Sequence, residues 1–389
     1  MQEIYFDNAA TTQVLPEVAD LALHMMREEY GNPSALYQKG LRAERCVKQA
    51  REQIAAQIGA KPQEIIFTSG GTESNNMAVR GVMHNRAKRG RHLIISSVEH
   101  QSVMQTARAL LEEDFDFDLL PVNSQGVINL AAVPKMIRPD TVLVSVMLVN
   151  NEVGALQPIA ELRQAMNSVR ANLLLHVDAV QGFGKMPLDV HQLGIDFLSV
   201  SGHKLHAPKG TGFLYVRQGL RVPPLLTGGG QEGGWRSGTE NVPGICALGL
   251  AAQLAGEQMQ ARREQIEKVR QTFLQGLQNL DGWEINGPTA EAAYLPNILN
   301  IYFAGVKSEI LLHLLETEGL LVAAGSACAN NHKDSLSHVL RAMQLRRAQI
   351  EGSLRFSFSH LNTTEEAERA AQIICQQVPP LRETLHLGR

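Results

Sequence analysis

The stretch Leu173–Lys204, LLLHVDAVQGFGKMPLDVHQLGIDFLSVSGHK, decides the predicted fold of this chain. Its first apolar run ends at Asp178, and a second run, FLSVS, leads directly to Lys204. Continuous apolar runs without polar alternation are typical of parallel strands that are covered on both faces. Because the carboxyl ends of parallel strands meet at one edge of a sheet, we expect Asp178 and Lys204 to be neighbours there.

The same alternation of strand and helix continues on both sides of this stretch. Further strands are predicted at Glu64–Ser69, His92–Ser97 and Thr141–Val149, with an antiparallel partner at Gly212–Val216. Helices are predicted at Glu73–Ala87, Gln101–Leu111, Pro158–Val169 and, as one long helix, Pro243–Leu280. Strands at Leu299–Phe303 and Leu354–Phe358 follow. The pattern predicts an α/β fold with a mainly parallel sheet and a smaller α+β domain. We expect a large domain over 15–257 and a small domain formed by 1–14 and 258–389.

Composition narrows the function classes. The 389 residues carry 36 Lys+Arg against 39 Asp+Glu, so no broad basic surface points to a nucleic-acid partner. Four cysteines argue against a disulfide scaffold and fit a reducing compartment. The N-terminus MQEIYFDNAATT lacks the basic and apolar regions of a signal peptide, and the longest apolar run, Thr141–Val149, is too short to span a membrane. We therefore expect a cytoplasmic protein without a membrane partner.

Asp178 and Lys204 together indicate a pyridoxal phosphate (PLP) site. An aspartate can pair with the protonated pyridine nitrogen, and a lysine can form the Schiff base. Either residue alone is more often a solvated surface group. The combination at two strand ends, with His203 beside the lysine, is more specific.

A phosphate group needs hydrogen-bond donors, and the segment Gly70–Thr72 lies between a predicted strand and a predicted helix. A helix N-terminus offers free N–H groups and a favourable dipole, so Gly71 and Thr72 are candidate phosphate ligands. Ser201 and His203 can add donors from the lysine loop. The alternative is an ordinary turn with Thr72 as the helix N-cap.

Three other segments carry candidate cofactor contacts. His100 follows a predicted strand and can stack on a planar cofactor and move protons, or it can be a capping histidine. Asn151 also follows a strand and can bind a ring hydroxyl, or it can be a turn residue. The stretch Gly228–Thr239 matches a dinucleotide pattern formally, but prolines precede it and no helix follows. We interpret it as a flexible loop that presents Thr239.

The four cysteines differ in their surroundings. Cys328 lies in AAGSACANNHKDS, a polar setting that suits a reactive thiolate, whereas Cys46, Cys246 and Cys375 lie in helical or apolar patterns typical of packing. The spacing of Cys328 and His332 lacks two further ligands, so no metal is expected. Arg355, in the strand-like SLRFSFS, is either a grip for a substrate carboxylate or a structural ion pair.

Motifs along most of the chain resemble one family, the cysteine desulfurases of the NifS/IscS type, within the class V aminotransferase branch of fold-type I PLP enzymes. They are YFDNAATT (Tyr5–Thr12), YGNPS (Tyr30–Ser34), GGTESNN (Gly70–Asn76), EH (Glu99–His100), NNEVG (Asn150–Gly154), HVDAVQ (His176–Gln181), SGHK..APKG (Ser201–Gly210), GGGQE (Gly228–Glu232), RSGT (Arg236–Thr239), GSAC (Gly325–Cys328) and LRFSF (Leu354–Phe358). Their joint occurrence in order is far more specific than any single motif.

The resemblance implies PLP as the cofactor, L-cysteine as the substrate and a homodimer. Sulfur would leave L-cysteine, giving L-alanine and a persulfide on Cys328 that passes to an acceptor in iron–sulfur cluster assembly or thiolation. The implied site residues are Lys204 (Schiff base), Asp178 (ring nitrogen), His100 (ring stacking and proton transfer), Asn151 and Gln181 (ring oxygen), Thr72, Ser201 and His203 (phosphate), Thr239 (phosphate of the partner subunit), and Arg355 with Asn32 (substrate carboxylate).

The sequence also departs from the family pattern at three places. Tyr37 stands where the family often has His, Gly233 where Arg is common, and AAGSAC precedes and includes the cysteine in place of SSGSAC. A selenocysteine lyase or cystine C–S lyase of the same fold is the alternative function, and a non-catalytic sulfur-relay protein is a third.

Overall fold

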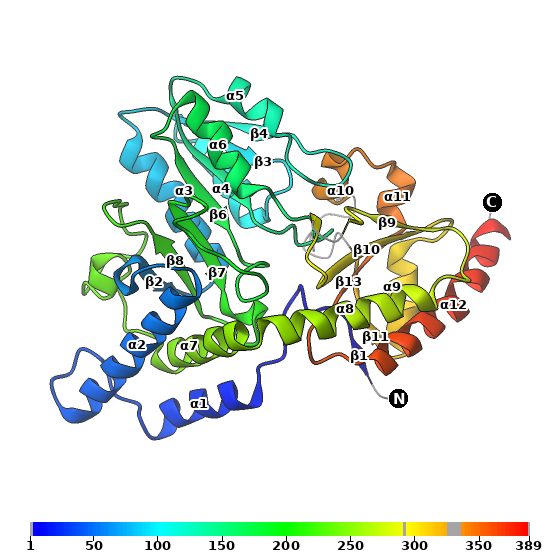
Figure 1. Cartoon of the computed structure of the whole chain (residues 1–389), viewed down its shortest axis with the longest axis horizontal. Coiled ribbons are helices and arrows are strands. Elements are labelled where there is room, and N and C mark those ends of the chain that lie inside the picture. Colours follow the sequence, from blue (N-terminus) through cyan, green and yellow to red (C-terminus); the bar gives the residue numbers. More distant parts are fainter. Residues whose placement is uncertain (1–2, 291–292, 325–335, 388–389) are drawn as a thin grey trace.

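The computed structural model describes residues 3–290, 293–324 and 336–387. A mainly parallel sheet lies at the centre of its larger part, with the spatial order β2, β8, β7, β6, β5, β3, β4 (Figure 1). The strands are β2 (Ile65–Thr68), β3 (His92–Ser96), β4 (Asp116–Leu120), β5 (Thr141–Met147), β6 (Leu174–Asp178), β7 (Phe197–Ser201) and β8 (Gly212–Val216). Only β8 runs antiparallel to its neighbours, β7 and β2. The predicted fold class is confirmed.

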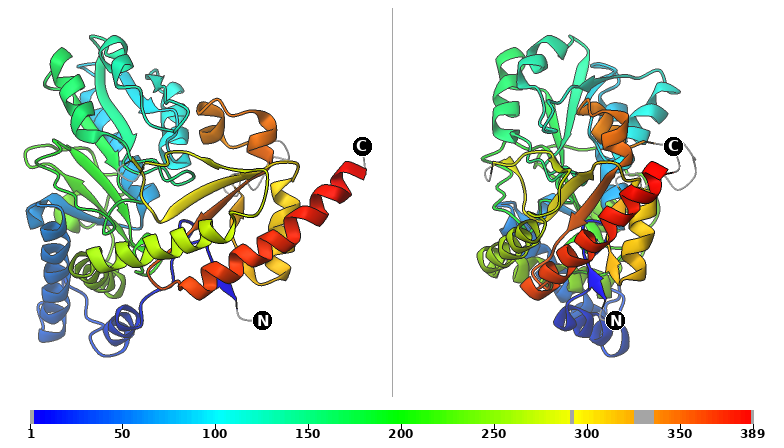
Figure 2. Two further views of the ribbon diagram at one scale, coloured as in Figure 1. Left: turned by 45° about the vertical axis from the view of Figure 1, so that its right-hand side comes forward. Right: turned by 90° about the vertical axis from the view of Figure 1, so that its right-hand side faces the viewer.

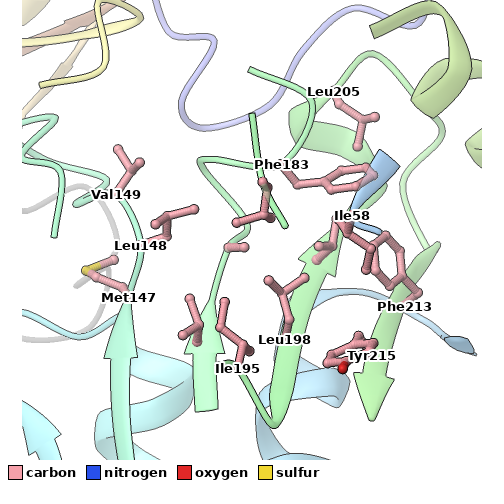
Figure 3. Close-up of a cluster of buried hydrophobic side chains, with 14 of the residues drawn as sticks. Ile58, Met147, Leu148, Val149, Phe183, Ile195, Leu198, Leu205, Phe213 and Tyr215 are labelled. Atoms are coloured by element: carbon pink, nitrogen blue, oxygen red, sulfur yellow. The ribbon is translucent and has the colours of Figure 1, made fainter. Parts of the chain in front are cut away.

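Helices bury both faces of this sheet, which explains the continuous apolar runs. Leu174 and Phe197 belong to a buried cluster with α3 and α4, whereas the next residues, Leu175 and Leu198, belong to a cluster on the other face. Successive side chains of a strand point to opposite faces, so both faces must be apolar. Figure 3 shows part of the second cluster, where Leu198 lies near Phe213. The helices are α3 (Gly71–Arg86) and α4 (Gln101–Leu111) on the first face, and α1 (Pro16–Arg27), α2 (Gln38–Gln57), α5 (Val133–Met136), α6 (Ile159–Val169) and α7 (Val242–Glu257) on the second.

A second, antiparallel sheet has the order β12, β13, β10, β9. Its strands are β9 (Trp283–Asn286), β10 (Ile298–Phe303), β12 (Ala323–Ala324) and β13 (Ser353–Ser357). The helices of this part are α8 (Met259–Gly276), α9 (Ser308–Thr317), α10 (His338–Ala342), α11 (Arg347–Glu351) and α12 (Thr364–Leu387). Figure 2 shows α8 beside α12, and these helices pack on the sheet through a separate buried cluster.

The N-terminal residues connect the two parts of the chain. Strand β1 (Ile4–Tyr5) pairs in parallel with β11 (Leu320–Leu321), and Phe6 packs in the second part. The following segment, Asp7–Thr12, which we call the N-terminal strap, then crosses to the large sheet. Its Ala9 N–H donates to Ser357 Oγ at 2.8 Å, and its Thr12 N–H donates to the His203 carbonyl at 2.9 Å.

Two elements differ from the sequence prediction. The expected single helix over Pro243–Leu280 is two helices, α7 and α8, that meet at the non-helical Gln258. Strand β4 was not predicted, because its sequence DFDLL at the edge of the sheet is partly exposed and carries two aspartates. In the described ranges, no helix is both long and apolar enough to cross a bilayer.

The stability of the second part of the chain should depend strongly on Phe273. Its buried ring lies 5.9 Å from the Phe6 ring, 4.9 Å from that of Phe356 and 5.9 Å from that of Phe358. We expect Phe273→Ala to lower the free energy of unfolding by about 3–5 kcal/mol, since it leaves a cavity among these rings. Urea unfolding measures this, with the exposed Gln275→Ala on the same helix as control. Equal stability of the two variants would contradict the assignment.

Candidate active site

The structure brings Lys204 and Asp178 to the same edge of the large sheet. Asp178 is the last residue of β6, and Lys204 ends the 3₁₀ turn Gly202–Lys204 that follows β7. The Lys204 amine donates to the carbonyl oxygens of Ala9 and Ala10, each at 2.6 Å. Both Asp178 and Lys204 act electrostatically on His100, so the three side chains form one cluster.

Asp178 is held by a residue that the sequence analysis did not identify. Asn75, on α3, donates through Nδ2 to Asp178 Oδ2 at 2.7 Å, and the Val180 N–H donates to Asp178 Oδ1 at 3.0 Å. Asn75 Nδ2 also lies 2.8 Å from Ser102 Oγ. The Asp178 carboxylate is buried, and these donors fix its orientation. The sequence signals for Asn75 were its position one turn into the helix after Gly71 and its place in the motif GGTESNN.

His100 takes the capping role, one of the two that its sequence position allowed. It is the N-cap of α4, where its Nδ1 accepts from the Ser102 N–H at 3.1 Å. The pKa of His100 is lowered from its ordinary value, and burial is the main cause. The Lys204 amine also lowers it, whereas the Asp178 carboxylate raises it. The ring is therefore neutral near pH 7. Because Nδ1 accepts a hydrogen bond, the neutral ring carries its proton on Nε2.

The start of α3 and the lysine loop line one concave site. Its lining includes Ser69, Gly70, Gly71, Thr72, Ser201, His203 and Lys209. Gly70 is the N-cap with φ 146°, so the alternative of Thr72 as N-cap was wrong: the helix begins at Gly71, two residues before the predicted start at Glu73. A Cβ on Gly71 would lie 2.7 Å from Val180 Cγ2, which explains the glycine. Free N–H groups of a helix start, a hydroxyl and a lysine suit a phosphate group.

His203 lies at the junction of this concave site and the N-terminal strap. Its Nδ1 is 3.2 Å from Thr11 Oγ1. Burial, with a smaller effect of the Lys204 amine, lowers the pKa of His203 to about 4. The imidazole is therefore neutral near pH 7, and it offers a hydrogen bond rather than a charge.

Gln181 faces the strap from the turn after β6. Its Nε2 donates to the Ala9 carbonyl at 3.0 Å, and its Oε1 accepts from Lys185 Nζ at 3.4 Å. Lys185 was not identified from the sequence. It is partly buried, and burial together with Lys204 lowers the pKa of Lys185 to about 7.

Arg355, on β13, forms the ion pair that was one of its two predicted roles. Its Nη2 lies 2.7 Å from Asp7 Oδ1, and its Nη1 donates to the Asn151 carbonyl at 3.1 Å. Arg355 Nε is buried and has no hydrogen-bond partner among the residues that the structure describes. The contact with Asn151 uses the backbone. The neighbouring Asn150 shapes the turn, since its Oδ1 accepts from two following N–H groups.

Two of the residues predicted for the site, Asn32 and Thr239, lie in other parts of the structure. Asn32 is exposed in the connection between α1 and α2, where its Oδ1 accepts from the Ser34 N–H, and Figure 1 shows this connection far from β13. Thr239 is exposed in the glycine-rich loop and lines a separate concave site with Ser69. That loop is tied to α3, because Arg236 Nε lies 2.9 Å from Glu73 Oε1.

Cys328 lies outside the described residues, but both flanks of its segment adjoin the site. On one flank, Ala323 in β12 pairs with Arg355 in β13. On the other, Ser337 Oγ donates to the buried Glu152 Oε2 at 2.5 Å, and His338 Nε2 lies 2.8 Å from the Glu99 carbonyl oxygen.

Glu99 is a buried acid that the sequence analysis did not assign. Its Oε1 accepts from Ser96 Oγ at 2.5 Å and from the Met147 N–H at 2.7 Å, whereas Oε2 is buried without a partner. Burial is the main cause that raises the pKa of Glu99 to about 8, and Asp178 contributes. An acid behind His100 is thus protonated near neutral pH. The described residues contain no cluster of three or more His, Cys, Asp or Glu suited to a metal ion.

Comparisons with known proteins agree with one another. The family model described as aminotransferase class-V matches residues 4–370. Cysteine desulfurase IscS of Methanosarcina thermophila is 40% identical over 97% of this chain and 93% of that protein. Putative cysteine desulfurase IscS 1 of Bacillus subtilis (strain 168) is 42% identical over 98% of this chain and 100% of that protein. The solved structure of a NifS-like protein has 36% identity and a TM-score of 0.90, covering 99% of this chain and 100% of that chain.

Because the pKa of Glu99 is raised, this side chain should lower the stability of the folded chain as the pH rises. Its pKa is about 8 in the folded chain against 4.5 as the ordinary value, so between these pH values the folded state binds more protons than the unfolded state. This lowers the stability of the wild type by up to about 1.4 kcal/mol per pH unit. Glu99→Gln keeps the Oε1 acceptor and removes the effect, so its stability relative to wild type should increase from pH 6 to pH 8.

Urea unfolding at several pH values measures this difference, and Glu112→Gln, at an exposed position of the same region, is the control. If the Glu99→Gln and wild-type profiles ran parallel between pH 6 and pH 8, Glu99 would be ionised in the folded chain and the assignment would be wrong.

Proposed function

This chain belongs to the class-V aminotransferase family, and from that premise we infer that it is a cysteine desulfurase, a PLP-dependent enzyme that removes sulfur from L-cysteine. The observation that carries this inference is the cluster of Lys204, Asp178 and His100 at one sheet edge. A primary amine, a fixed carboxylate and a neutral imidazole are the groups that this chemistry requires of the protein.

The site residues fit PLP as the resident cofactor. We propose that the concave site at the start of α3 holds the phosphate through Gly71, Thr72, Ser201 and His203. Asp178, fixed by two donors and acceptor-only when ionised, suits a protonated ring nitrogen. The side chains assigned to the ring oxygen are those of Asn151 and Gln181. When bound, PLP supplies an electron sink for the bonds at the substrate Cα.

Lys204 and His100 are proposed to move protons. The Lys204 amine is held by two strap carbonyls at the edge where Asp178 ends β6, and we assign it the proton of the substrate Cα. His100 carries its proton on Nε2, because Nδ1 is occupied by the Ser102 N–H. His100 Nε2 is therefore the atom that gives or takes a proton during sulfur transfer.

Arg355 is proposed to bind the substrate carboxylate. Asp7 and the Asn151 carbonyl hold its guanidinium in place, and its buried Nε has no partner within the described chain. An aligned guanidinium with a donor to spare suits a carboxylate. Asn32, the second proposed contact, would have to come from a second copy of the chain, since its own connection lies far from β13 (Figure 1).

Cys328 is proposed to receive the sulfur. Its Sγ would bond to the substrate sulfur while the substrate C–S bond breaks, leaving a persulfide on Cys328 and L-alanine. Cys328 follows Ala324 by four residues, a separation that an extended chain spans in about 14 Å. Since β12 pairs with the strand of Arg355, this reach supports the assignment. The persulfide then passes to an acceptor protein.

A homodimer is supported by exposed apolar residues in one region. Helix α1 and the α1–α2 connection expose Leu23, Met26, Tyr30, Leu36 and Tyr37, with Leu36 94% exposed. Gathered apolar exposure of this kind marks an interaction surface. We propose that a second copy covers it and that the exposed Thr239 contacts the phosphate of the partner subunit.

Variants of Cys328 and Lys204 should distinguish the loss of sulfur transfer from the loss of cofactor binding. We expect Lys204→Ala to purify without the yellow colour of bound PLP. We expect Cys328→Ala to keep the colour but form alanine from cysteine at least about 100-fold more slowly, because the sulfur acceptor is missing. Absorbance spectra and an alanine assay measure both. Cys375→Ser is the control, and alanine formation by Cys328→Ala at the wild-type rate would exclude the persulfide role and favour a lyase.

Asp7 should act through Arg355. Asp7→Asn removes the charge that orients the guanidinium, so we expect the KM for cysteine to rise about tenfold with little change in kcat. Steady-state kinetics measure this, with the exposed Asp20→Asn as control. An unchanged KM would mean that Arg355 does not bind the substrate carboxylate.

A further inference from the structure

Helices α2 and α7 pack side by side in parallel, and their contact positions advance together along both sequences (Figure 1). A Cβ placed on Gly249 would lie 2.6 Å from Ala50 Cα, so the backbones approach closely there. One turn further, Gln53 Nε2 donates to Gln253 Oε1 at 2.5 Å. Such close approach is possible only because position 249 has no side chain.

Cys46 and Cys246 occupy the same row of contacts, one turn before Ala50 and Gly249. Cys46 acts electrostatically on the Cys246 thiol, so the two side chains lie near each other. Cys246 is buried, with 5% exposure, whereas Cys46 is partly exposed. From the sequence, both residues were interpreted as separate packing residues, because they lie far apart in the chain. Neither takes part in the proposed desulfurase site.

We propose that Cys46 and Cys246 are a modification site, which forms an intramolecular disulfide when the protein meets a peroxide. The Cys46 sulfur attacks a peroxide oxygen, which breaks the O–O bond, gives a sulfenic acid and releases water. The Cys246 sulfur then attacks the Cys46 sulfur, the S–S bond forms and a second water leaves. In total, two thiols are oxidised and one hydrogen peroxide is reduced to two waters.

The order of attack follows from the surroundings of the two thiols. Cys46 is the one that a small oxidant reaches, because it is the more exposed. Burial and the neighbouring Cys46 raise the pKa of Cys246 to about 12, so Cys246 stays a thiol at neutral pH and is not the first of the two to be oxidised. A disulfide requires Cα atoms about 4.4–6.8 Å apart, closer than most helix pairs place them. The glycine at 249 brings the two helix backbones together one turn from the cysteines, which favours such a short separation.

The disulfide would link two distant parts of the sequence and fix α2 on α7. Because it constrains the unfolded chain, it should stabilise the fold. Helix α2 begins directly after the exposed residues Leu36 and Tyr37, so the bond would also anchor the helix that follows the proposed dimer surface.

The test treats the PLP-loaded protein with a small excess of hydrogen peroxide, blocks free thiols with N-ethylmaleimide and maps non-reduced peptides by mass spectrometry. We expect a Cys46–Cys246 linked peptide that dithiothreitol cleaves, and a melting temperature raised by about 5 °C in the oxidised form. Cys46→Ala and Cys246→Ala should lose both effects, and Cys375→Ala, the matched control at another partly exposed helical cysteine, should keep both.

Alkylated Cys46 and Cys246 after peroxide, or Cys46 over-oxidised while Cys246 stays free, would overturn the proposal. Linkage of Cys46 to a second molecule would do the same. Because the readout is the peptide map and not cysteine turnover, this result is independent of the proposed function. If the Cys246→Ala variant failed to fold, the partly exposed Cys46→Ala alone would decide.

Discussion

The arrangement of the site depends on the hydrogen bonds that the backbone of Ala9 makes. Its carbonyl accepts from Lys204 Nζ at 2.6 Å and from Gln181 Nε2 at 3.0 Å, and its N–H donates to Ser357 Oγ at 2.8 Å. One residue thus joins the lysine loop and the turn after β6 to the second sheet. Asp7, in the same strap, fixes Arg355 at that sheet. The strap therefore links the amine to the guanidinium, in addition to the direct contact of Arg355 Nη1 with the Asn151 carbonyl.

Electrostatics at this edge follow from burial. Desolvation disfavours charge, so His100 and His203 are neutral and Glu99 is protonated near neutral pH. The Asp178 carboxylate is buried too, but Asn75 and the Val180 N–H satisfy it. The hydrogen bonds of the Asp178 carboxylate are made, whereas His100, His203 and Glu99 carry no charge. A positive charge is therefore stabilised next to Asp178, and for this reason the site suits a cofactor with a protonated ring nitrogen.

The sequence predicted the strands of the large sheet well, because both faces are apolar and the runs are continuous. It also placed Asp178 and Lys204 together, since parallel topology fixes which strand ends meet. It did not identify Asn75, Lys185 or the nearness of Cys46 and Cys246, because these depend on tertiary packing rather than on local pattern. For Arg355 the sequence left two roles open, and the ion pair with Asp7 depends on where the N-terminal strap crosses. The break at Gln258 follows Gly256 by two residues, a glycine that the sequence prediction did not take as a helix end.

The central claim is that this site transfers sulfur from cysteine to Cys328. The most direct measurement mixes the PLP-loaded protein with one equivalent of L-cysteine, stops the reaction with an alkylating reagent, and counts alanine and modified cysteines by mass spectrometry. The account predicts one alkylated persulfide on Cys328 for each alanine formed. Alanine accompanied by free sulfide and an unmodified Cys328, or a persulfide on a different cysteine, would contradict it.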